Sequence, residues 1–365
     1  MSRTRQSLWR LSVVLALGLA GCGGAASTTA SIGSVPASSS PPSLVAKASA
    51  APPSPSSAGN PAALTKVNLL YATDAGPAAP VWVAGDEGLY KKYGLEVALS
   101  HAGGSLSTDA LVAGKADMAL NAGADSITAM TAGTSLKIVL VLQKVNPYAV
   151  VVQPSIKAAS DLKGKSLAIS KIGDTSDLSA HIALGRFGLV PGKDVVERQI
   201  GNSPARFAAL QSGQVDAAME DEAYTDLLVQ QGMHVLVSLS QEKVPYIANA
   251  LIVAGNFTKK DPRTVEAVIR GTLDGLHFVT DSGHRNETLS VIAKYQRTDA
   301  ASPKVAKVYE TLQKTLAQDP TPDLAGAETM LTSLKVMDPT RYAKLSPAEV
   351  IDASFIKAVK ASPAG

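Results

Sequence analysis

Residues 111–119 read Leu-Val-Ala-Gly-Lys-Ala-Asp-Met-Ala, and residues 210–218 repeat the pattern as Leu-Gln-Ser-Gly-Gln-Val-Asp-Ala-Ala. In each copy a glycine ends a helix, a tight turn follows, and an aspartate precedes a short apolar strand. Gly133 and Gly232 then close the next helix at equal spacing from the two copies. Two copies in matching contexts predict two similar lobes with a cleft between them.

Short apolar segments alternate with helical stretches around both copies. In the first half we expect strands at 67–72, 95–100, 118–121 and 136–142, and helices at 81–93, 106–113 and 126–132. The alternation restarts at Asp161, with strands at 166–170, 195–200, 217–220 and 235–239. Beyond Thr258 the pattern is helical, with helices expected at 265–280, 287–295, 303–317, 324–337 and 347–361. This order predicts an α/β fold with parallel sheets covered by helices and a helical C-terminal region.

The late helices are expected to pack on the first lobe, so the chain should cross between the lobes twice, near 147–154 and near 244–253. Lobe 1 is then predicted to comprise residues 65–150 and 245–365, and lobe 2 residues 151–244.

The N-terminus has the pattern of an export signal. Arg3, Arg5 and Arg10 precede an apolar run that ends in Leu-Ala-Gly before Cys22, the single cysteine of 365 residues. This run is too short to span a bilayer stably and predicts a cleaved signal at residues 1–21. Its end resembles the lipobox of bacterial lipoproteins, which implies acylation of Cys22 and a lipid anchor on the extracytoplasmic face of a bacterial membrane. Residues 22–64, rich in Ala, Ser and Pro, are expected to form a disordered tether.

Composition excludes several classes of function. Removal of residues 1–21 takes away three arginines and no acid, so the formal charge of +3 becomes neutral and gives no support for nucleic-acid binding. The five histidines have no metal-ligand spacing, which predicts no metal site. The stretch Gly164-Lys165-Ser166 is not a phosphate loop, because Ala159 stands where that motif needs glycine. No nucleophile elbow occurs either, so no catalysis and no cofactor are expected.

One stretch is more specific than the rest: residues 80–97, Pro-Val-Trp-Val-Ala-Gly-Asp-Glu-Gly-Leu-Tyr-Lys-Lys-Tyr-Gly-Leu-Glu-Val. It resembles the opening of solute-binding proteins of the nitrate, sulfonate, taurine and thiamine-precursor group of ABC importers. The resemblance continues through Gly103-Gly104-Ser105, residues 161–165 and 188–194, and ends at residues 350–355, thus covering residues 65–360. It implies a two-lobed periplasmic-binding-protein-like fold (type II), a ligand cleft between the lobes, and docking on a membrane permease.

Open α/β sheets bind ligands at the carboxyl ends of their strands, where N–H groups at helix starts are free. Loops at these ends supply the candidate ligand-binding residues. In lobe 1 they are Thr73, Asp74, Trp82, Gly104, Ser105, Asn121, Ala122 and Asp125. In lobe 2 they are Ser170, Gly173, Thr175, Ser176, Asn202, Ser203, Glu220, Asp221 and Tyr224. Ser105, Thr175 and Ser203 are equally well explained as helix caps. The resemblance places Trp82 at the cleft mouth, where its indole could stack on a planar ligand, and a position in the lobe 1 core is the alternative.

Basic residues are few in these loops, with Lys171 and Arg206 as the candidates, whereas Glu220, Asp221 and Glu222 form an acidic run. Nitrate and sulfonate need positive charge, so this run favours an uncharged or cationic ligand, such as a pyrimidine or another heterocyclic amine, and a sulfonate-like ligand stays open. We therefore expect a monomeric, lipid-anchored receptor for a small molecule that partners a permease and has no nucleic-acid partner. An extracytoplasmic enzyme or a sensory module on the same fold is the alternative.

Overall fold

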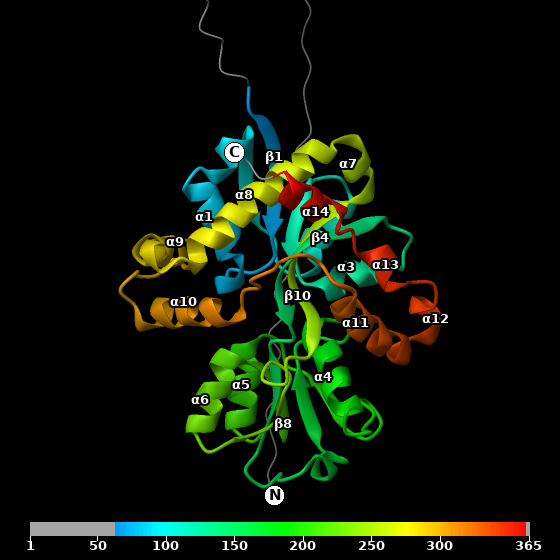
Figure 1. Ribbon diagram of the computed structural model, residues 1–365. Helices are drawn as coiled ribbons and strands as arrows, with labels where there is room; N and C mark the ends of the chain where they lie inside the picture. Colours follow the sequence, from blue (N-terminus) through cyan, green and yellow to red (C-terminus); the bar gives the residue numbers. More distant parts are fainter. Residues whose placement is uncertain (1–62, 363–365) are drawn as a thin grey trace, which may run out of the picture. The chain divides into compact units, whose positions relative to one another are not determined.

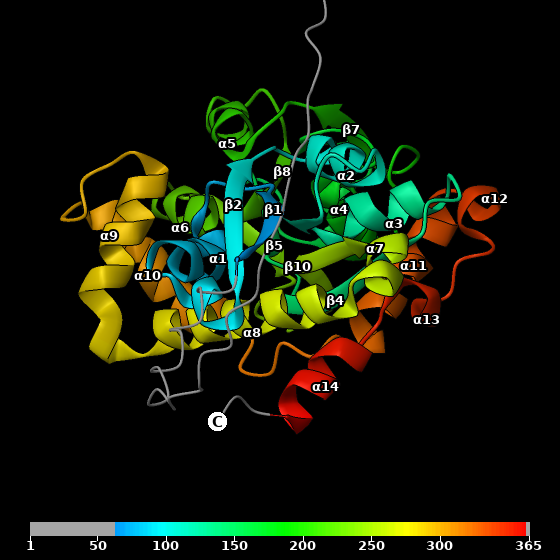
Figure 2. The same cartoon turned by 90° about the horizontal axis from the view of Figure 1, so that it is seen from above.

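The computed structural model describes residues 63–362, so the predictions for the export signal, Cys22 and most of the tether lie outside the described residues. The described chain forms two five-stranded sheets, each with helices on both faces (Figures 1 and 2). None of its helices is both long enough and apolar enough to cross a membrane.

The first sheet has the order β2-β1-β3-β10-β4. Its strands are β1 (Thr65–Tyr71), β2 (Leu95–His101), β3 (Met118–Asn121), β4 (Leu136–Val145) and β10 (Pro245–Ala254). β1 is parallel to β2 and β3, whereas β10 is antiparallel to both β3 and β4. β10 returns from the second lobe, which sets its opposite direction. The α/β fold class is confirmed, but the first sheet is mixed where a parallel sheet was expected.

The second sheet has the order β7-β6-β8-β5-β9. Its strands are β5 (Tyr148–Val152), β6 (Ser166–Ile169), β7 (Val196–Gln199), β8 (Ala217–Asp221) and β9 (His234–Ser238). β6 is parallel to β7 and β8, but β5 enters from the first sheet and pairs antiparallel with β8. The segments 147–154 and 244–253, which we expected only to cross between lobes, thus contribute β5 and most of β10.

Helices cover both faces of each sheet. One face of the first sheet carries α1 (Ala79–Asp86), α8 (Pro262–Thr280), α9 (Arg285–Gln296), α10 (Pro303–Thr315) and α14 (Ser354–Ala361), and the other carries α2 (Ser105–Val112), α3 (Gly123–Met130) and α11 (Leu324–Met337). The second sheet lies between α4 (Thr175–Gly185) and the pair α5 (Ser203–Gln211) and α6 (Glu222–Gln230). The remaining short helices are α7 (Gly255–Lys260), α12 (Pro339–Tyr342) and α13 (Pro347–Val350).

Alternation along β10 separates the two cores of the first sheet. Ala250 and Ile252 belong to the cluster under α3 and α11, whereas Leu251 and Val253 belong to the cluster under α1 and α8. This is the two-residue period of a strand buried on both faces.

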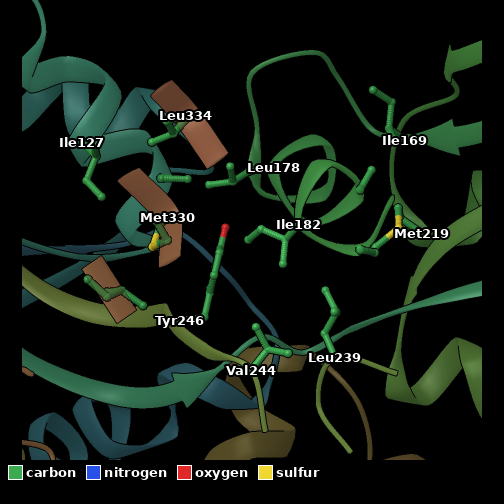
Figure 3. Close-up of a cluster of buried hydrophobic side chains, with 14 of the residues drawn as sticks. Ile127, Ile169, Leu178, Ile182, Met219, Leu239, Val244, Tyr246, Met330 and Leu334 are labelled. Carbon is green, nitrogen blue, oxygen red and sulfur yellow. The ribbon is translucent and has the colours of Figure 1, made fainter. Parts of the chain in front are cut away.

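The cluster that includes Ala250 continues into the second lobe. Figure 3 shows Ile127 of α3 and Met330 and Leu334 of α11 around Tyr246, with Leu178 and Ile182 of α4 on the opposite side. The two lobes therefore share one apolar core along the contact between α11 and α4.

The repeated aspartate accepts an equivalent backbone hydrogen bond in both lobes. Asp117 Oδ2 accepts the N–H of Asn68 in β1 at 2.8 Å, and Asp216 Oδ2 accepts the N–H of Ser166 in β6 at 2.9 Å. Each preceding glycine has a left-handed backbone, with φ of 67° at Gly114 and 75° at Gly213. A side chain there would be strained, so the motif ends one helix and fastens the next strand to its neighbour.

Two predicted helices are divided. The helix expected at 81–93 ends at Asp86, because Gly88 takes a left-handed φ of 67°, and a 3-10 helix follows at Leu89–Tyr93. The helix expected at 347–361 breaks between α13 and α14, where Ile351 bridges to Ile138 of β4. The helix expected at 126–132 starts earlier, at Gly123. The other predicted strands and helices agree with the structure to within a few residues.

Candidate functional site

Ionisable side chains from both lobes gather where β3, β6 and β8 end. β3 leads into α3 with Asp125, β6 leads to Lys171 and Asp174 at the start of α4, and β8 ends at Asp221. The charge of Asp174 raises the pKa of Asp125 in the first lobe and of Tyr148 in the second. Asp174 therefore lies within electrostatic range of a group in each lobe, which makes these strand ends the candidate site.

Asp125 is the first-lobe member of this site. Burial is the largest cause that raises the pKa of its carboxyl to about 6, and the charge of Asp174 adds to it. Lys171 opposes the shift, as does the Asn121 side chain. A carboxyl with this pKa changes its charge near neutral pH, when a charged partner would gain or lose a strong contact.

Tyr148 lies at the centre of the second-lobe members. It is directly opposite Asp221 in the antiparallel β5–β8 pair, so both side chains are on the same face of the sheet. Burial raises the pKa of the Tyr148 hydroxyl above its usual range, Arg206 lowers it, and Asp221, Asp174 and Glu220 raise it further. The hydroxyl therefore stays neutral at physiological pH and can donate a hydrogen bond.

Glu220 and Arg206 form a buried pair behind this face. Arg206 is 2% exposed and Glu220 is 0% exposed. Neither carboxylate oxygen of Glu220 has a hydrogen-bond partner within the described chain. Burial is the main cause that raises the Glu220 pKa to about 8, although Arg206 opposes it.

The two acids that follow Glu220 have other partners. Asp221 caps α6 through the N–H of Tyr224 at 3.4 Å and accepts the Ser203 hydroxyl at 2.9 Å. Glu222 accepts the Ser240 hydroxyl at 2.9 Å. Of the three acids, Glu220 is buried, Asp221 faces Tyr148, and Glu222 is hydrogen-bonded to Ser240 in the loop after β9.

The loop before α4 is organised by Asp174. Its Oδ1 accepts the N–H groups of Ser176 and Asp177, and its other oxygen accepts the Ser170 hydroxyl. Ser176 also binds the N–H of Ser170 at 2.8 Å. Gly173 has a φ of 85°, and Thr175 begins the helix. The predicted residues Ser170, Gly173, Thr175 and Ser176 thus belong to the loop and first turn of α4 around Asp174, whose charge acts on Asp125.

In the first lobe, Asn121 is a structural residue. Its Nδ2 donates to Gly104 O at 3.2 Å, to Ser107 Oγ at 3.0 Å and to Thr108 Oγ1 at 2.9 Å, and it is 3% exposed. It fixes the start of α2, where Gly104 and Ser105 are exposed, against Ala122, the residue before α3.

Three predicted first-lobe residues are not gathered with Asp125. Trp82 is 0% exposed in the core beneath α8 and stacks on Tyr295 with 4.7 Å between ring centroids, so the structure places it in the lobe 1 core and not at a cleft mouth. Thr73 binds the N–H of Ala75 at 3.0 Å, and Asp74 raises the pKa of Tyr71. Both lie in the loop after β1, and neither is among the groups that shift the pKa of Asp125.

The remaining second-lobe candidates lie at the start of α5 and α6. Asn202 caps α5 by accepting the N–H of Ala205 at 3.3 Å, and Ser203 joins Arg206 to Asp221. Tyr224 is half-buried beside Phe207, with ring centroids 5.9 Å apart. Sequence reasoning did not find Tyr148 or Tyr246, because only the pairing of β5 and β10 shows where these strands deliver their side chains.

Residues 77–284 match the family described as NMT1/THI5 like, and the chain belongs to this family. None of the curated proteins matches the sequence significantly.

Solved structures share the two-lobed periplasmic-binding-protein fold. A protein from Bordetella bronchiseptica is 23% identical with a TM-score of 0.65, covering 82% of this chain and 98% of its own. The periplasmic aliphatic sulphonate-binding protein SsuA from Escherichia coli is 20% identical with a TM-score of 0.63, covering 77% of this chain and 94% of its own. The periplasmic nitrate-binding protein NrtA from Synechocystis is 15% identical with a TM-score of 0.62, covering 82% and 89%.

Proposed function

We propose that this chain is the solute-binding component of an ABC importer, and that it binds a small uncharged or cationic organic molecule between its lobes without catalysis. Membership of the NMT1/THI5-like family and the shared fold support the receptor role. In this proposal the lobes are residues 65–147 with 245–365 and residues 148–244, because the strand that begins at Tyr148 pairs within the second sheet and not the first, as the expected boundary at 150 had it. The receptor acts as a monomer.

The balance of charge at the site carries the choice of ligand. Glu220 keeps its proton up to about pH 8, so its carboxyl adds little negative charge at neutral pH. Three further acids, Asp125, Asp174 and Asp221, act on the site against two bases, Lys171 and Arg206. Each nitrogen of the Arg206 guanidinium donates to a protein oxygen and the side chain is 2% exposed, so the group is not presented as an open fork for an anion. Sulfonate and nitrate are bound best by such charged donors, so an amine or a neutral heterocycle fits this site better.

Native mass spectrometry of the purified full chain, followed by calorimetry, tests the ligand class. A panel of cytosine, 4-aminopyrimidine and 4-amino-5-(hydroxymethyl)-2-methylpyrimidine should include a stoichiometric ligand, whereas taurine, methanesulfonate and nitrate should not bind. Asp221→Asn should weaken an amine-bearing ligand by roughly tenfold or more, because a charge-assisted hydrogen bond contributes about 1.5–3 kcal/mol. Glu310→Gln, on the exposed side of α10, is the matched control. Preferential binding of an anion refutes the ligand class, and release of a modified product refutes the receptor role in favour of an enzyme.

The anchor is part of the same proposal. Cys22 is the single thiol available for acylation, so Cys22→Ser should abolish incorporation of a fatty-acid analogue and release the protein from the membrane. Equal labelling of both forms contradicts the lipid anchor but leaves the ligand site untouched. A permease and an ATPase encoded beside this chain would favour import over the sensory alternative.

A further inference from the structure

Three potential metal ligands meet on the second lobe, between helix α4 and strand β7. Asp177 and His181 are one turn apart on α4, and Glu197 lies on β7, the edge strand of the second sheet. One ligand atom from each lies within 4.8 Å of the other two. The sequence spacing of the histidines did not reveal this cluster, because Glu197 reaches it from another element.

The distances do not fit hydrogen bonds. His181 Nε2 is 3.6 Å from Asp177 Oδ1 and 3.8 Å from Glu197 Oε1, and an N–H to carboxylate bond would measure roughly 2.7–3.2 Å. Two ligands of one tetrahedral ion at zinc-like bond lengths are roughly 3.3–3.6 Å apart. His181 Nε2 is therefore spaced from each carboxylate oxygen as two ligands of a shared ion would be, within a few tenths of an ångström, and the ligand atoms of Asp177 and Glu197 lie within 4.8 Å of each other.

Without a cation between them, burial of the Asp177 and Glu197 carboxylates would destabilise the folded protein. The side chain of Asp177 is 1% exposed and that of Glu197 is 11% exposed. Asp177 Oδ1 and Glu197 Oε1 are both buried without a hydrogen-bond partner in the described chain. Two such oxygens that face each other need a cation or a proton between them.

The other carboxylate oxygen of Asp177 has a hydrogen bond that fixes the orientation of the side chain. Asp177 Oδ2 accepts the N–H of Gly173 at 2.6 Å, in the loop that also holds Asp174. An ion bound to Oδ1 would therefore connect β7, α4 and the loop at the solute site. Ligating carboxylates are commonly fixed by such a second hydrogen bond.

We propose that Asp177, His181 and Glu197 bind a divalent metal ion such as zinc. The site is structural, because the bound ion would link edge strand β7 to helix α4. Two carboxylate oxygens and one imidazole nitrogen form a donor set suited to zinc, with a fourth position left for water. The inference does not depend on the identity of the solute, because the three side chains belong to α4 and β7 alone.

The test uses the full chain, stripped with a chelator and dialysed against Zn²⁺ or Co²⁺. We expect one equivalent of metal by elemental mass spectrometry, a ligand-field absorption band from bound Co²⁺, and a higher melting temperature with metal than without. His181→Asn and Glu197→Gln should each weaken Zn²⁺ at least tenfold, measured against a competing chromophoric chelator. Asp177 is not replaced, because its bond to Gly173 makes a folding defect hard to separate from metal loss.

The matched control is His234→Asn, which removes an exposed histidine from β9 of the same sheet. It should bind metal as the wild type does. Equal metal content and melting temperature in the wild type and in His181→Asn overturn the proposal, and the two carboxyls then share a proton. Loss of the metal in His234→Asn also overturns it, because the ion would then be bound elsewhere.

Discussion

The guanidinium of Arg206 lies 3.5 Å from a carboxylate oxygen of Glu220, but its hydrogen bonds go elsewhere. Its Nε donates to Met219 O at 2.6 Å, and its two terminal nitrogens donate to Gly201 O at 2.7 Å and to Ser203 Oγ at 2.8 Å. Arg206 thus ties the end of β8 to the start of α5, and Glu220 is left buried without a donor. A carboxyl in this position retains its proton to high pH.

The first prediction concerns stability against pH. The pKa of Glu220 is raised to about 8 in the folded protein, above the value of 4.5 that an unburied glutamate has. The folded state therefore holds a proton that the unfolded state has lost, so this group's contribution to stability is full below the lower value and disappears as pH rises towards 8. Urea unfolding should show a loss of order 1–3 kcal/mol between pH 5 and pH 8 that Glu220→Gln lacks. An identical pH dependence in both proteins contradicts the raised pKa.

The second prediction concerns binding against pH. Asp125 has its pKa raised to about 6, so its carboxylate is mostly ionised at pH 7 and mostly neutral at pH 5. A cationic solute whose own charge is constant over this range should bind about tenfold more weakly at pH 5. Calorimetry should find this dependence in the wild type and in Glu310→Gln, and little of it in Asp125→Asn. Persistence of the full dependence in Asp125→Asn would assign it to another group.

The order of strands and helices could be predicted because each element depends mainly on residues within and next to it. Helix ends and strand starts can be recognised directly from the Gly114 and Gly213 turns, the apolar runs and the capping aspartates. The crossing segments β5 and β10 could not be identified, because their direction and partners depend on the second sheet and not on neighbouring residues. For the same reason a parallel sheet was predicted where a mixed one formed.

The site was predictable as a set of loops but not as a set of contacts. Strand ends indicate where Asp125, Ser203 and Asp221 lie, since carboxyl ends of parallel strands meet at one edge. The sequence does not show that the Asn121 side chain makes its hydrogen bonds within the first lobe, or that Tyr148 lies opposite Asp221. These facts follow from register, which a single chain pattern leaves open.

The third prediction uses two helical glycines. A Cβ on Gly275 of α8 would lie 2.0 Å from the carbonyl oxygen of Pro80 at the start of α1, whereas a Cβ on Gly185 of α4 meets nothing within 4 Å. Gly275→Ala must force α8 away from α1 and should cost about 1–3 kcal/mol. Gly185→Ala should stabilise the protein by up to about 1 kcal/mol, because alanine is the better helix former. Thermal unfolding of both variants checks the opposite signs, and equal effects would contradict the close packing of α8 on α1.

The last prediction concerns Trp82, whose indole is enclosed by aromatic rings of its own lobe. It stacks on Tyr295 with an interplanar angle of 5° and meets Tyr71 edge-on at 5.6 Å between centroids. Trp82→Ala should therefore destabilise the protein by about 3–5 kcal/mol, as expected for loss of a large core side chain. Tyr295→Phe keeps the stacked ring and loses only the hydroxyl bond to Asp86 Oδ1 at 3.2 Å, so it should cost about 1 kcal/mol.

Fluorescence separates this core position from a place in the solute site. Trp9 lies in the predicted export signal, so a chain that has lost residues 1–21 would contain Trp82 as its single tryptophan. Its emission should be blue-shifted in the folded protein and move to the red on unfolding, because the ring is 0% exposed. A solute that saturates by calorimetry should leave both the intensity and the wavelength unchanged, since the rings around Trp82 come from β1 and α9 and not from the second lobe. A saturable change in emission at the same solute concentrations would instead place the indole within reach of the cleft.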